Sequence, residues 1–98
     1  MNILDRAALC EGKRNEWICD AIVVCNTEER YKELKAQPHA KHVGVTWSDD
    51  EHPENLGGLM IEPGDTFTFV IDDFDNLSHL AALMILVYVA RDGTKVML

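Results

Sequence analysis

The sequence predicts a small α/β domain, a three-layer sandwich in which a mainly parallel sheet of about four strands is flanked by two to three helices. Two observations predict this class. The run AIVVC at 21–25 is continuously apolar and β-branched, as in a strand that is covered on both faces, and two further β-rich runs follow at 42–47 and 66–71. A segment with helical character separates the first two runs, and such a strand–helix–strand unit requires a parallel pair.

The first predicted elements are a helix over residues 3–16 and a strand over 17–25. The helix is indicated by an apolar stripe that includes Ile3, Leu4 and Ala7, with Gly12 at its end or in the following turn. The strand runs from Trp17 through the AIVVC segment. Together these segments predict that one helix precedes the sheet.

A second helix is expected directly after this strand. Asn26 is the predicted N-cap, and Glu29 stands three residues later, as in a variant of the capping box. Pro38 ends the helix, and residues 42–47 (HVGVTW) form the second strand.

The second half of the chain predicts a loop over 48–58 with at most one helical turn, a strand over 66–71, a helix and a last strand over 94–98. Asn76 or Ser78 caps the helix, and Asp92-Gly93 closes it with a left-handed residue. Between residues 80 and 90 this helix is apolar on every side, which predicts that it packs tightly in the core or against a partner.

Length and charge limit the function classes. The 98 residues correspond to a single α/β domain over 1–98, with 47% hydrophobic and 27% charged residues. The formal net charge of −8 predicts no direct binding of nucleic acid through a basic groove and no electrostatic binding to an anionic membrane.

The three cysteines, Cys10, Cys19 and Cys25, form no CxxC pair and lie among apolar residues, which predicts reduced, packed thiols. Cys25 ends a strand beside a helix N-terminus, a setting that lowers a thiol pKa, but packing is the favoured interpretation. The N-terminus has no apolar signal region, and the apolar run at 80–90 is too short to span a bilayer. We therefore expect a cytoplasmic protein.

Polar side chains follow each of the three main predicted strands. In a parallel sheet the carboxyl ends of the strands form one rim, where ligands commonly bind. Carboxylates on that rim suit Mg²⁺, although Asp and Asn at strand ends also serve simply as helix caps. The predicted ligand rim consists of Asn26, Thr27, Ser48 and Asp49, and Asp72 and Asp73 are the candidate Mg²⁺ ligands.

The segment FTFVIDDFDNLSHL resembles the Walker B segment of P-loop NTPases, in which apolar residues precede an acidic pair. The resemblance extends to AIVVCNTEERYKELKAQ, HVGVTW and GTKVML, which are similar to neighbouring parts of helicase-type, RecA-like cores. It implies that Asp72 would orient Mg²⁺ and that Asp73 would stand at the catalytic carboxylate position. The phosphate-binding motif GxxxxGK[ST] is absent from the sequence, so the resemblance implies a non-hydrolysing relative, and we assign no catalytic residue.

An acidic surface is the remaining feature. Such a surface can bind the basic groove of a partner protein, or it can simply keep a protein soluble. The residues predicted to form it are Asp49, Asp50, Glu51, Glu54 and Asp75.

Three hypotheses for function follow. The first is a non-catalytic, accessory or inhibitor-like protein, of the kind encoded by phages and mobile elements, that binds a protein partner and needs no cofactor. The second is a Mg²⁺-dependent nucleotide-binding protein or enzyme that uses the strand-end acids. The third is a structural subunit of a larger assembly; the apolar last helix and the open sheet edges also predict homodimerisation or pairing with a larger protein.

Overall fold

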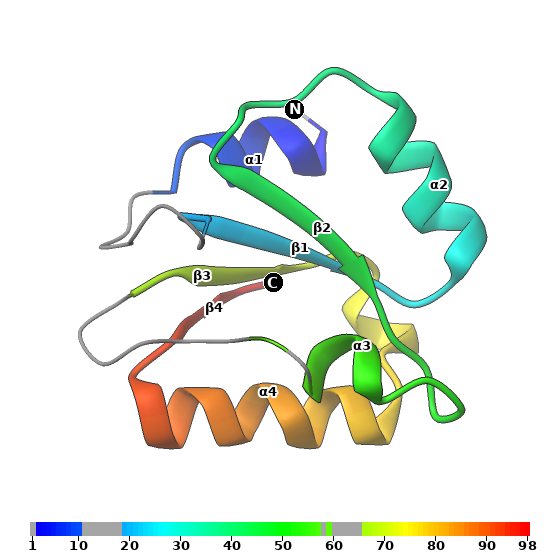
Figure 1. Cartoon of the computed structure of the whole chain (residues 1–98), viewed down its shortest axis with the longest axis vertical. Coiled ribbons are helices and arrows are strands. Elements are labelled where there is room, and N and C mark those ends of the chain that lie inside the picture. Colours follow the sequence, from blue (N-terminus) through cyan, green and yellow to red (C-terminus); the bar gives the residue numbers. More distant parts are fainter. Residues whose placement is uncertain (1, 11–18, 58, 60–65) are drawn as a thin grey trace.

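A computed structural model describes residues 2–10, 19–57, 59 and 66–98, and it places one parallel sheet between two layers of helices (Figure 1). In chain order the elements are α1 (Ile3–Ala8), β1 (Ala21–Cys25), α2 (Glu28–Ala36), β2 (Val43–Trp47), α3 (Glu54–Gly57), β3 (Thr68–Ile71), the 3₁₀ turn η1 (Phe74–Asn76), α4 (His79–Asp92) and β4 (Lys95–Met97).

The strand order is β2-β1-β3-β4, and all three neighbouring pairs are parallel. The chain leaves β1 toward β2 on one side, and it later places β3 on the other side of β1. The point where the direction of winding reverses therefore lies between β1 and β3. This arrangement confirms the predicted α/β class with its parallel sheet.

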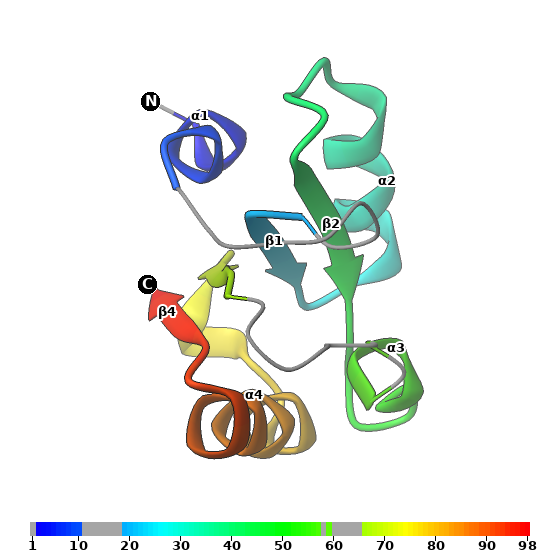
Figure 2. The ribbon, with the colours of Figure 1, turned by 60° about the vertical axis from the view of Figure 1, so that its left-hand side comes forward.

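The two faces of the sheet have separate cores. Figure 2 shows the helices that cover them, with α1 and α2 on one side of the sheet and α3 and α4 on the other. Alternate residues of a strand point to opposite faces, so Val23 of β1 belongs to the core under α1 and α2, whereas Val24 belongs to the core under α3 and α4. Phe69 of β3 joins Val24 on the α4 side, and Val70 joins Val23 on the α2 side. Because both faces are covered, the continuous apolar character of these strands is explained.

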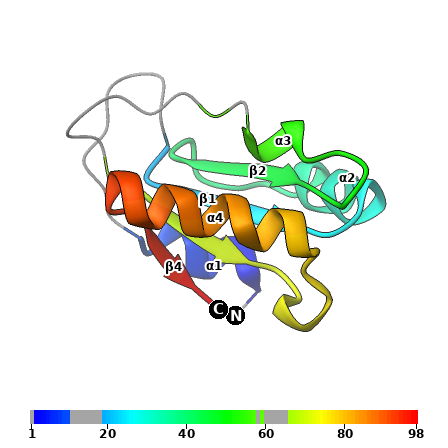
Figure 3. The same cartoon turned by 90° about the horizontal axis from the view of Figure 1, so that it is seen from below.

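Helices α3 and α4 lie side by side on one face of the sheet (Figure 3). The ends of α4 agree with the sequence prediction, because the side chain of Ser78 accepts a hydrogen bond from the Ala81 N–H and Gly93 has a left-handed φ of 72°. The single helical turn expected in the loop after β2 is α3. No helix in the described part of the chain has the length and apolar character needed to cross a membrane.

The first helix is shorter than predicted, because α1 ends at Ala8 instead of residue 16. Its buried face consists of Ile3, Leu4 and Ala7. Leu9 is the C-cap of α1, and its backbone N–H bonds to the carbonyl oxygens of Arg6 and Ala7. Residues 11–18 lie outside the described residues, and so does the predicted start of the strand at residue 17; in the described part, β1 begins at Ala21.

The predicted cap of the second helix is also wrong. Thr27, not Asn26, is the N-cap of α2, and its hydroxyl accepts a hydrogen bond from the Arg30 N–H at 3.1 Å. The third residue after the cap is then Arg30, so the predicted capping box with Glu29 does not form. The side chain of Asn26 makes a longer-range contact, which is described next.

Candidate functional site

The carboxyl ends of β1, β2 and β3 lie at one edge of the sheet, as parallel pairing requires. Backbone bonds continue the pairing just past the strands, from Ser48 N to Cys25 O at 3.1 Å and from Asp72 N to Val24 O at 2.9 Å. The strand ends that were predicted to form the rim therefore lie together at one edge of the sheet. In such a sheet a ligand would be expected between the ends of β1 and β3, at the switch point where the direction of winding reverses.

Asn26 connects the two strands at this switch point. Its side-chain Nδ2 donates to the carbonyl oxygens of Asp72, at 3.3 Å, and Asp73, at 2.9 Å. Its Oδ1 is buried and has no hydrogen-bond partner among the described residues. The amide thus ties the end of β1 to the turn after β3.

The carboxylates after β3 are held by neighbouring side chains. Arg30 Nε donates to Asp72 Oδ2 at 2.9 Å, and Arg30 Nη1 donates to Glu33 at 3.0 Å. The bond with Asp72, and after it the bond with Glu33, raises the pKa of Arg30, so the guanidinium stays charged beside the end of β3. Asp73 has a left-handed φ of 58°, and its Oδ2 accepts from Asn76 Nδ2 at 2.7 Å. Hydrogen bonds and an ion pair within the protein therefore occupy these side chains at the switch point.

The remaining rim residues serve the fold. Thr27 caps α2, and Ser48 is fully buried with its hydroxyl donating to the carbonyl of His52 at 3.2 Å. Cys25 is also fully buried, and burial, aided by the charge of Asp72, raises the pKa of its thiol to about 12. Cys25 is therefore a protonated, packed thiol, as the sequence indicated. Within the described ranges, no three His, Cys, Asp or Glu side chains gather as ligands for a metal ion.

The acidic residues after β2 form a structured loop. Asp49 Oδ1 accepts bonds from the backbone N–H groups of Glu51 and His52, at 2.9 and 2.8 Å, and lies 2.9 Å from His52 Nδ1. The His52 contact lowers the pKa of Asp49, and the pKa of His52 is raised in turn. Asp50 Oδ1 accepts from the Leu80 N–H at 3.3 Å, which places this loop against the first turn of α4. Asp75 lies in η1, at the same edge of the sheet.

The outer face of α4 is apolar and uncovered in this structure. Its inner face contributes Ala81, Ile85 and Tyr88 to the core. The outer face exposes four large apolar side chains, with exposed fractions of 38% for Leu80, 57% for Leu83, 61% for Leu86 and 54% for Val87.

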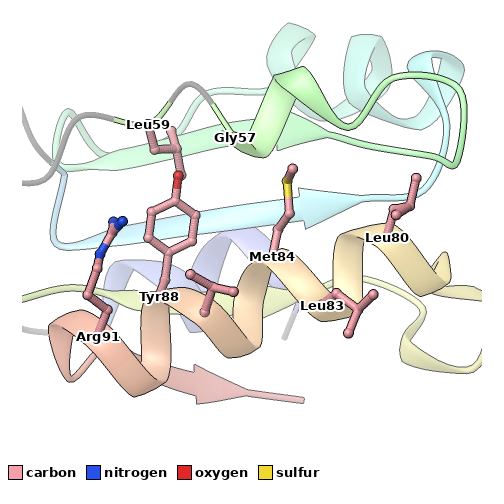
Figure 4. Close-up of a pocket in the computed structure, with 8 residues that line it drawn as sticks. Gly57, Leu59, Leu80, Leu83, Met84, Tyr88 and Arg91 are labelled. Atoms are coloured by element: carbon pink, nitrogen blue, oxygen red, sulfur yellow. The ribbon is translucent and has the colours of Figure 1, made fainter.

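A groove runs along the side of α4 that faces α3 (Figure 4). It encloses about 450 Å³ and is lined from α4 mainly by Leu80, Leu83, Met84 and Val87, with Arg91 at its far end. Figure 4 shows the Met84 side chain extending from α4 toward α3, where Gly57 is placed. The Tyr88 hydroxyl, at the inner side, donates to the Leu56 carbonyl at 2.6 Å. The groove is therefore an open, mainly apolar surface depression between α3 and α4.

Comparison with protein-family models, with curated proteins and with solved structures finds no match to this chain. The resemblance to the Walker B segment accordingly stays a prediction, as does Mg²⁺ binding by Asp72 and Asp73.

The structure brings the predicted rim residues to one edge, but it directs most of their side chains into internal contacts. The groove beside α4 was not predicted. Its signal was present in the sequence, because a helix that is apolar on every side cannot bury all of its faces against a single sheet.

Proposed function

We propose that this protein is a non-catalytic protein-binding module whose contact surface is the outer face of α4, formed by Leu80, Leu83, Leu86 and Val87. The observation that carries the proposal is the exposure of these four side chains on one helix. Isolated apolar residues are common on protein surfaces, whereas contiguous apolar patches mark interaction sites.

The charge of the protein supports a protein partner. At a net charge of −8 the chain repels nucleic acid and anionic membranes, while the acidic loop beside α4 complements a basic protein surface. The loop supplies Asp49, Asp50 and Glu51, and α3 begins with Glu54; all four were predicted as partner-binding residues, as was Asp75, which lies in η1.

The alternative, Mg²⁺-dependent nucleotide binding, finds less support at the strand ends. Asp72 is paired with Arg30, and Asp73 is bonded by Asn76. A nucleotide at this position would have to displace the bonds of Asn26 as well. The protein-binding proposal needs no such rearrangement.

Selection of helical peptides from a random display library on the immobilised protein tests the proposal. We expect selected peptides to bind with micromolar affinity and to lose at least about tenfold in affinity for the double variant Leu83→Gln, Leu86→Gln, because truncating a few central apolar anchors removes most interface energy. The matched control is Lys32→Gln, Lys35→Gln on the exposed face of α2, which should bind as the wild type does.

Two results would overturn the proposal: recovery of no binders, or binders that are insensitive to the α4 variant. A thermal-shift titration with Mg²⁺ and nucleotides gives a second test. Stabilisation that Asp72→Asn abolishes would favour the nucleotide-binding alternative, whereas no shift supports the binding module.

A further inference from the structure

The groove between α3 and α4 has the dimensions of a helix-binding site. Leu80, Met84, Val87 and Arg91 follow one another at spacings of four, three and four residues, so they form one stripe along α4. At 1.5 Å per residue this stripe extends about 16 Å, or roughly three helical turns. Amphipathic helices bind such grooves through apolar side chains at the same spacing.

The groove is less well suited to a small polar ligand. Sites for small molecules combine apolar walls with several convergent polar groups. The Tyr88 hydroxyl is already bonded to Leu56, and Arg91 pairs with Asp92 at 2.9 Å while its guanidinium lies 5.5 Å from the ring of Tyr88. The groove therefore presents chiefly apolar surface along its length.

The two ends of the groove differ in charge. At the end near Leu80, Asp50 lies against the first turn of α4. Glu54 is exposed on α3 and precedes Gly57, a lining residue, by one helical turn, so the two share a face of that helix. Glu51 is exposed in the same loop, and the opposite end carries Arg91. An occupant is therefore favoured if its basic side chains lie at the Leu80 end.

We propose that this groove binds an amphipathic helix of a partner protein, with the apolar stripe of the helix on Leu83, Met84 and Val87 and its Lys or Arg residues beside Asp50, Glu51 and Glu54. The inference rests on the proposed protein-binding function and adds the class of partner. A second copy of this chain is a less favoured occupant, because each copy carries a net charge of −8.

Two synthetic peptides of about 16 residues provide the probe. Both carry Leu at positions i, i+4 and i+7, and they differ only in having Lys or Glu at the polar positions of one half. Isothermal titration at low salt should show binding of the Lys peptide, weaker binding by at least about tenfold of the Glu peptide, and loss of affinity for the Lys peptide as salt is raised.

Matched variants locate the contact. Leu83→Glu should weaken the Lys peptide by more than about tenfold although it adds an attractive charge, because a carboxylate in the apolar groove must be desolvated. Leu9→Glu, which introduces the same charge at an exposed leucine at the C-cap of α1, should change affinity by less than about twofold. Glu54→Lys should weaken binding by about fivefold, whereas Glu29→Lys, an exposed first-turn glutamate of α2, should not.

The outcomes separate this inference from the proposed function. Equal binding of the two peptides, or equal effects of Glu54→Lys and Glu29→Lys, would overturn the inference that the groove selects a basic helix. The proposed function would still be supported if the display library yields peptides whose binding depends on α4. A dimer in light scattering that Leu83→Glu dissociates would show that the occupant is a second copy and would also overturn the inference. A library without α4-dependent binders would overturn the proposed function itself.

Discussion

Helices α2 and α4 cover opposite faces of one sheet (Figure 2), and each packs against it through its inner side. Only Leu34 of α2 is fully buried, and the outer surface of that helix is charged, with Lys32 bonded to Glu28 at 3.4 Å and Arg30 to Glu33 at 3.0 Å. The outer surface of α4 is apolar along its length. Both helices therefore cover the sheet, but the outer face of α2 is charged whereas that of α4 is apolar.

This difference shows what the fold itself does not require. A helix on a parallel sheet needs one apolar stripe, and α2 demonstrates that charged residues on the remaining surface suffice. Leu83, Leu86 and Val87 of α4 contribute exposed apolar surface that the sheet does not use. We interpret that surface as selected for contact with another molecule.

The largest expected effect separates the inner from the outer face of α4. Ile85→Ala should lower the free energy of unfolding by about 3 kcal/mol, because it leaves a cavity in a buried core, and Leu86→Ala should change it by less than about 0.5 kcal/mol. Urea denaturation of the two variants measures both values. If Leu86→Ala were as destabilising as Ile85→Ala, the outer face would be packed in solution and the contrast with α2 would fail.

The next effect concerns the hydrogen bond that joins α4 to α3. The Tyr88 hydroxyl donates to the buried Leu56 at 2.6 Å, which joins α4 to α3 at the inner side of the groove. Tyr88→Phe should cost about 1–2 kcal/mol because the Leu56 carbonyl loses its partner in the interior. Tyr31→Phe on α2 is the control, since no described residue hydrogen-bonds that hydroxyl and no loss of stability is expected. Thermal unfolding of the two variants checks the difference.

On the α2 side the corresponding contact is an ion pair. Arg30 is 39% exposed and joins α2 to Asp72 at the end of β3. Arg30→Gln should lower the free energy of unfolding by about 1 kcal/mol, less at high salt, because exposed ion pairs are weak and screened. A double-mutant cycle with Asp72→Asn measures the coupling. A coupling energy of zero would mean that Asp72 is free to bind another ligand, which would favour the Mg²⁺ prediction.

The parallel sheet could be predicted because its signals are local. The apolar run at 21–25 predicts a strand covered on both faces, and the helix before 42–47 requires a parallel crossover. Gly93 closes α4 as predicted, since a left-handed cap depends on one residue. Such features need no knowledge of distant parts of the chain.

The details of the rim could not be predicted, because they depend on contacts across the sheet. Asn and Thr are both common N-caps, and in the structure the side chain of Asn26 bonds to the carbonyl groups of Asp72 and Asp73 while Thr27 caps α2. Likewise the pairing of Asp72 with Arg30 joins residues 42 positions apart. In the structure these residues of the predicted ligand rim are therefore bonded to one another and to their neighbours.

The smallest expected effect concerns the pKa of His52 in the acidic loop at the start of α4. It tests whether this loop is ordered, in contrast to the exposed glutamates of α2. The bond to Asp49, together with the charges of Glu54 and Glu51, raises the pKa of His52 above its ordinary value of about 6.5. A raised folded-state pKa means that protonation stabilises the fold, so this contribution is fully present below about pH 6.5 and is lost as the pH rises through the folded-state value. Titration of the His52 ring by NMR should give a pKa above 6.5, and Asp49→Asn should lower it. A wild-type value at or below 6.5 would mean that the loop is solvated and that its charges are not fixed beside the groove.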